Sequence, residues 1–129
     1  MKIKLELNQA QADILQDALD LYSRILTGQF DEIDNLMRFG AGNNVERKTT
    51  RMLLEELKEL YFPELGRCAT HSIGSDKTPD KSKIAYDMVQ VIRYAIARHK
   101  NPKGGNIVDF LPPVQYGGLE FIKCEVQPE

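Results

Sequence analysis

The chain has 129 residues, of which 42% are hydrophobic and 28% charged, and its formal net charge is -2 at neutral pH. This length suffices for one domain with a hydrophobic core, and the composition is typical of a globular rather than a disordered protein. The net charge excludes bulk binding of nucleic acid through overall charge, although residues 77–103 carry seven basic and two acidic side chains.

The chain begins with a predicted strand and a predicted helix. Residues 2–7 alternate between polar and apolar side chains, which is the pattern of a half-buried strand. Asn8 and Gln11 then have the spacing of a capping box, and the apolar spacing that follows predicts a helix over residues 9–27. Gly28 either ends that helix or is tolerated within it.

Two further helical patterns follow. A helical spacing continues over residues 30–39, and the glycine-rich residues 40–44 interrupt it. A second helix is predicted over residues 45–61, because its apolar side chains recur at helical spacing and Pro63 ends it. Residues 63–77 are predicted to be irregular, and loops of that length are often functional or mobile.

The last helix has the clearest start. Thr78, Pro79 and Asp80 supply a predicted cap, a proline at the first helical position and an acid in the first turn. The apolar residues that follow cover a wide arc, so we expect this to be the central helix. Asn101 and Pro102 end it.

The C-terminal residues 117–126 alternate again and predict a second strand. Paired with residues 2–7, this strand would form a small sheet. The predicted fold is therefore one α+β domain, mostly helical, in which three to four helices pack with a sheet from the N- and C-terminal strands. Because edge strands pair readily between subunits, a homo-oligomer is compatible with this fold.

The stretch HSIGSDKTPDKSK, residues 71–83, is the first candidate for a binding site. A helix N-terminus attracts anions, and hydroxyl and lysine side chains surround this one. It is not a P-loop, because no glycine directly precedes Lys77. On the next turns, tyrosine rings can stack on a base while Arg93 pairs with a phosphate. The alternative is a capped, solvated loop followed by an exposed helix edge. The candidate ligand-binding residues are Ser75, Lys77, Lys81, Lys83, Tyr86, Arg93 and Tyr94.

A second candidate is a cluster of carboxylates. Glu55, Glu56 and Glu59 form an E-E-x-x-E pattern on a predicted helix, and Asp87 follows on the last helix. This resembles the MazG-type nucleoside triphosphate pyrophosphohydrolases, whose E-E-x-x-E and E-x-x-D helices hold magnesium. The resemblance implies magnesium as cofactor, but Ile84 stands where the second motif has a glutamate. The alternative is a solvated acidic helix face.

The few cysteines and histidines are a third candidate. Cys68 and His71 have plausible spacing for half of a zinc site or for a nucleophile and its base, and His99 and Cys124 are the remaining pair. Two cysteines are too few for a disulfide scaffold. In the alternative interpretation Cys124 is a core residue and His99 a cation at a helix C-terminus.

Two runs of sequence, ALDLYSRILTGQFDEI (residues 18–33) and AYDMVQVIRYAIA (residues 85–97), resemble small uncharacterised accessory proteins encoded by bacteriophages. The resemblance implies an accessory protein in the cytoplasm of a host cell rather than a metabolic enzyme. Some phage accessory proteins of this size sequester nucleotides made by host defence. No apolar stretch predicts a secretory signal or a membrane span, which also favours a cytoplasmic location and no membrane partner.

Three functions remain open from the sequence. The first is a non-catalytic protein that binds a small anionic ligand, a nucleotide among the candidates, without a cofactor. The second is a MazG-like magnesium-dependent hydrolase, and the third is a protein-interaction module that inhibits a host protein.

Overall fold

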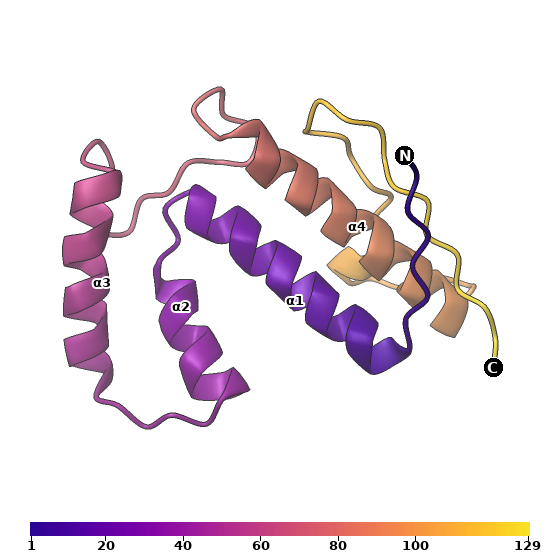
Figure 1. The fold of residues 1–129 in the computed structure, drawn as a ribbon, viewed down its shortest axis with the longest axis horizontal. Helices are drawn as coiled ribbons and strands as arrows, with labels where there is room; N and C mark the ends of the chain where they lie inside the picture. Colours follow the sequence, from indigo (N-terminus) through magenta and orange to yellow (C-terminus); the bar gives the residue numbers. More distant parts are fainter.

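The computed structural model describes all 129 residues and is built from helices and extended connections. The helices are α1 (Gln9–Leu26), α2 (Asp31–Asn35), the π-helical turn η1 (Leu36–Gly40), α3 (Arg47–Tyr61), α4 (Asp80–Lys100) and the 3₁₀ turn η2 (Val108–Phe110). Figure 1 shows them as a row, with α1 between α4 and α2 and with α3 outermost. None of them has both the length and the hydropathy of a membrane-spanning helix.

The core lies where α1 crosses α4. Ala85, Val89 and Ile92 of α4 are buried there. The hydroxyl of Ser82 donates to the main-chain carbonyl of Ser23 on α1 at 2.8 Å, and the two serine hydroxyls are 3.1 Å apart. Small side chains at this point let the two helices approach closely, and these bonds give both buried hydroxyls a partner. The last helix supplies three of the four buried apolar side chains, as its wide apolar arc predicts, but α1 rather than α4 lies in the middle of the row of helices.

Both ends of α1 follow from its sequence. Asn8 accepts a hydrogen bond from the main-chain N–H of Gln11, whose side chain accepts one from the N–H of Asn8, so the predicted capping box is present. At the other end Gly28 has a φ of 92°, and the N–H groups of Gly28 and Gln29 donate to the carbonyls of Ile25 and Arg24. This is a Schellman motif, so Gly28 ends the helix.

The predicted sheet is wrong, and with it the α+β class, because the structure contains no strand. Residues 2–7 and 117–126 are not helical, but no main-chain hydrogen bond joins the two segments. In the C-terminal segment Ile122 and Cys124 are half-buried while Lys123 and Glu125 are exposed. The alternation of apolar and polar residues therefore reflects an extended segment with one side packed against the protein, and not a strand that is hydrogen-bonded to another strand.

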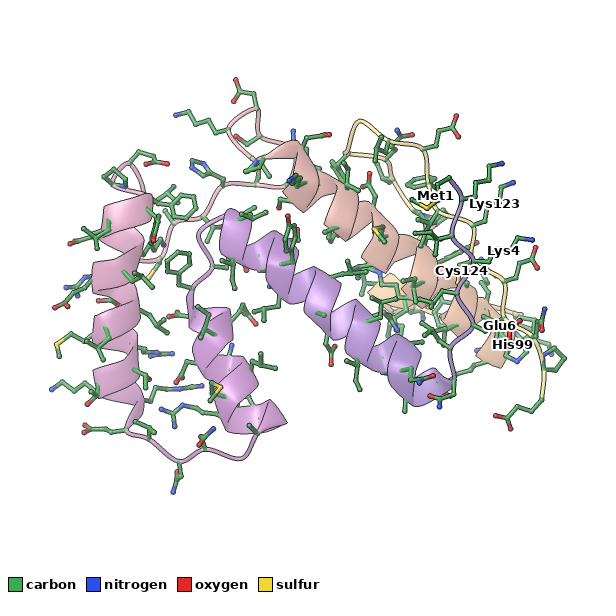
Figure 2. The ribbon with its side chains drawn as sticks, viewed as in Figure 1. Met1, Lys4, Glu6, His99, Lys123 and Cys124 are labelled. Carbon is green, nitrogen blue, oxygen red and sulfur yellow. The ribbon has the colours of Figure 1, made fainter.

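Both non-helical segments lie on the α4 side of the molecule, away from α3 (Figure 1). Figure 2 shows Lys4 and Glu6 of the first segment and Lys123 and Cys124 of the second at this end, together with His99 near the end of α4. The side chains of Ile3 and Leu5 are exposed there.

The start of α4 differs slightly from the prediction. The helix begins at Asp80, and its first carbonyl partner is Pro79, to which the N–H groups of Ser82 and Lys83 donate. Thr78 does not cap the helix with its side chain. Its hydroxyl instead donates to the carbonyl of Ser72 at 2.6 Å and closes the preceding loop.

Gly28→Ala tests the end of α1. We expect a loss of about 1–2 kcal/mol in the free energy of unfolding, because an alanine is strained at positive φ. Its Cβ would also lie 2.8 Å from Cδ1 of Leu65. Gly66→Ala is the control, since that position is open and has no positive φ. Equal midpoints for the two variants in thermal unfolding would contradict this account.

Candidate functional site

A polar clamp on α4 holds the C-terminal segment against the helix. Asp87 is buried, and its carboxylate accepts hydrogen bonds from the main-chain N–H of Tyr116 at 3.0 and 3.1 Å and of Gly117 at 2.8 Å. One turn later the Gln90 amide both donates to the carbonyl of Val114 and accepts from its N–H, each at 2.9 Å. These main-chain bonds, with one from the Gln90 amide to the Asp87 carboxylate at 3.4 Å, satisfy a buried carboxylate and a buried amide.

The clamp brings the chain very close to α4. A Cβ at Gly117 would lie 2.8 Å from Cγ1 and 2.9 Å from the main-chain nitrogen of Ile84, so only glycine fits. Gly118 donates its N–H to Asp80 in the first turn of α4 at 2.9 Å. Asp80 therefore holds the clamped segment at the positive end of the helix.

The clamp places Tyr116 beside two of the predicted ligand-binding residues. The rings of Tyr116 and Tyr86 have centroids 5.8 Å apart, and the guanidinium carbon of Arg93 lies 5.8 Å from the centroid of Tyr86. Arg93 forms none of the ion pairs of the structure. We name Tyr86, Arg93 and Tyr116 the tyrosine–arginine cluster. It offers a cation and aromatic rings, all of them only partly buried or exposed.

The other predicted ligand-binding residues on α4 lie on different faces of the helix relative to this cluster. Lys83 is one turn before Tyr86 on an adjoining face of the helix. Lys81 lies about 120° around the helix from Arg93. Tyr94 is engaged elsewhere, because the guanidinium of Arg98 lies 5.4 Å from its ring centroid.

In the loop that precedes α4, several main-chain N–H groups form hydrogen bonds within the loop itself. The N–H groups of Ser75 and Thr78 donate to the carbonyls of Ser72 and Ser75, and the N–H of Lys77 donates to the hydroxyl of Ser75. The Lys77 side chain is close enough to Glu64 to lower the pKa of that carboxyl slightly. The loop comes close to the tyrosine–arginine cluster at Gly74, where a Cβ would lie 4.0 Å from Cε1 of Tyr116. No hydrogen bond or ion pair joins Ser75 or Lys77 to the cluster.

The cysteines and histidines do not converge. His71 lies 2.9 Å from Glu64, and this hydrogen bond is the main cause of the lowered pKa of Glu64. Cys68 is exposed, and burial raises the pKa of the Cys124 thiol. No three His, Cys, Asp or Glu side chains lie close enough together to share a metal ion. Of the residues in the MazG-like pattern, Glu55 pairs with Arg67 at 3.4 Å and Asp87 belongs to the clamp.

A second charged cluster joins α2 and η1 to α3. The buried Asp34 carboxylate lies 2.8 Å from Nε of Arg38 and 3.4 Å from Nε of Arg47. The hydrogen bond from Arg38 is the largest cause of the lowered pKa of Asp34, against the opposing effect of burial. The sequence carried the i, i+4 signal for Asp34 and Arg38, but nothing in it indicated that Arg47 joins them. Tyr116 and Gln90 were also missed, because only the clamp gives them a role.

Asp87→Ala tests the clamp. We expect a loss of about 2–3 kcal/mol in the free energy of unfolding, because the buried N–H of Gly117 loses a charged acceptor. We also expect faster proteolytic cleavage after residue 111, since the segment is released from α4. Asp13→Ala is the matched control, because it removes an exposed aspartate of α1 that accepts no hydrogen bond and forms no ion pair. Equal protease sensitivity of Asp87→Ala and wild type would refute the clamp.

Asp34→Asn tests the second cluster through its pH dependence. The folded-state pKa of Asp34 lies below its ordinary value of 3.8, so the stability it contributes is full above that value and is lost as the pH falls through the lowered pKa. The difference in melting temperature between wild type and variant should be largest near neutral pH and shrink below 3.8. Asp31→Asn, an exposed change on the same helix, should show no such trend. A pH-independent difference for Asp34→Asn would contradict the assignment.

Comparison with protein-family models, with curated proteins and with solved structures found no match for this chain.

Proposed function

We propose that the protein binds a small anionic ligand with a planar group, such as a nucleotide, without transforming it. The observation that carries the proposal is the tyrosine–arginine cluster. Arg93 has no carboxylate partner, while Tyr86 and Tyr116 offer ring faces beside it. A guanidinium without a counter-ion can pair with a phosphate in two parallel hydrogen bonds, and a tyrosine ring can stack on a base.

The basic character of this part of the chain supports an anionic ligand. Lys83 is one turn from Tyr86, and residues 77–103 have a net positive charge although the whole chain is negative. Asp87 does not oppose the ligand strongly, because three N–H hydrogen bonds engage its carboxylate. The clamp also fixes Tyr116 in advance, so binding does not have to order that residue.

A binding protein of this kind fits the resemblance to phage accessory proteins, whose members include some that sequester nucleotides of host defence. In this proposal the protein lowers the free concentration of such a signal in the host cytoplasm. The MazG-like alternative requires magnesium-dependent release of pyrophosphate, which a binding protein does not produce.

The first test is thermal unfolding with AMP, GMP, CMP, UMP and inorganic phosphate, each added separately. A ligand at a hundred times its Kd stabilises the folded state by about 2.7 kcal/mol, which raises the melting temperature by several degrees. At least one nucleotide should produce this rise and be recovered unaltered. Arg93→Glu should abolish the rise, and Tyr86→Ala should weaken it for a nucleotide more than for inorganic phosphate.

Arg51→Glu is the matched control, because it makes the same change of charge at an exposed arginine of α3 that forms no ion pair. It should leave the ligand-induced rise unchanged. Absence of a rise with every compound, or its persistence in Arg93→Glu, would contradict the proposed site. Magnesium-dependent pyrophosphate release from a nucleoside triphosphate would instead support the hydrolase.

A further inference from the structure

The isolated chain exposes much more surface than a folded monomer of its mass. Its accessible surface is 9649 Å², whereas a monomeric protein of 14.7 kDa exposes about 6,900 Å². The excess is about 2,700 Å². Only four apolar residues are buried, while many large apolar side chains are exposed. A standard protein interface covers about 800 Å² on each partner and an obligate homodimer covers more, so the excess suffices for a stable dimer.

Part of this exposed apolar surface is a regularly spaced row of leucines on α3, which we call the leucine stripe. Leu53, Leu57 and Leu60 are 57%, 39% and 79% exposed. Their spacing of four and then three residues aligns them along one side of the helix, as in the seam of a coiled coil. The inner face of α3 is a different one, on which Leu54 is half-buried and Lys58 buried.

The apolar surface continues from the stripe toward η1. A cavity of about 320 Å³ opens between α3 and the α2–η1 segment, and Leu53, Met37 and Val45 are among its lining residues. All three are exposed. α2 is the one helix whose backbone comes close to α3, so neither α1 nor α4 covers this surface (Figure 1).

We propose that a second copy of this chain covers the leucine stripe, so that the two α3 helices pack against each other antiparallel about a two-fold axis. A two-fold interface uses the same patch on both subunits, and the stripe fits itself: reversed end to end, Leu53 lies opposite Leu60 of the partner subunit and Leu57 lies close to the axis. The inference is independent of the proposed ligand site, which lies on α4.

The charges along α3 favour the antiparallel direction. Arg47, Lys48 and Arg51 lie in its first half, and Glu55, Glu56 and Glu59 in its second. A parallel pair would place equal charges beside each other along the whole helix and would align the two helix dipoles. The antiparallel pair opposes the dipoles and moves the basic ends away from each other, so that like charges meet only where the acidic second halves overlap near the axis.

The first experiment measures the mass of the full chain in solution by light scattering after size exclusion at micromolar concentration. The wild type should have twice the chain mass of 14.7 kDa. Leu57→Glu should give the single-chain mass with its helical circular dichroism retained. Ile14→Glu is the matched control, since it places the same charge at an apolar residue of α1 that is 69% exposed, and it should stay dimeric. A monomeric wild type, or a dimer that survives Leu57→Glu, would overturn the proposal.

A second experiment tests the arrangement without adding charge. Both native cysteines, Cys68 and Cys124, are replaced by serine, and a cysteine is introduced by Leu57→Cys or by Leu60→Cys. In the antiparallel pair the introduced thiols at position 57 are adjacent and form a disulfide. Those at position 60 are about 10 Å apart along the axis and do not. Cross-linking of both variants, or of neither, would overturn the antiparallel arrangement.

Discussion

The close crossing of α1 and α4 at Ser23 and Ser82 is the contact on which the rest of the structure depends. Ser82 is fully buried, so a larger side chain there would push α1 away from the only substantial apolar core. With α1 fixed on one side, α4 has another face free, and Asp87 uses that face to hold the C-terminal segment. Helix α4 therefore contributes residues both to the core and to the candidate site. Because the core holds α4 in place, it also holds the site residues on that helix in place.

The helices were predictable because their signals are local. A capping box at Asn8 and a glycine at position 28 fix α1 whatever surrounds it. The sheet was not predictable in the same way, because alternation shows only that one side of an extended chain is covered. Residues 2–7 and 117–126 are not helical, yet whether their N–H groups find another strand depends on tertiary placement that no local pattern encodes.

The candidate site was predictable to the extent that it lies on one helix. Tyr86 and Arg93 are seven residues apart, so helical geometry alone aligns them, and the structure confirms their contact. Tyr116 reaches them over thirty residues of sequence through main-chain groups that Asp87 binds. Every residue except proline has a main-chain N–H, so the sequence offers no specific signal for such a bond. Lys81 is also close to Tyr86 in sequence, but it lies about 120° around the helix from Arg93, because proximity in sequence does not bring side chains to one face of a helix.

Helix α3 is attached to the rest of the chain mainly through charged side chains, and most of its leucines are exposed. An amphipathic helix usually buries its apolar face instead. The buried charged groups at this attachment are paired, since Lys58 donates to the carbonyls of Arg67 and Ala69 while Asp34 pairs with two arginines. The apolar contacts on the inner side are few: Leu54 is half-buried, and Tyr61 lies against the buried Phe30. The other three leucines of α3 are exposed. Charge-assisted bonds with full partners hold α3 at a defined place with little apolar burial. A helix that needed its leucines for the fold of its own chain would place them inward. The polar attachment of α3 thus leaves its apolar stripe unused within one subunit, which is the condition under which a second subunit gains most by covering it.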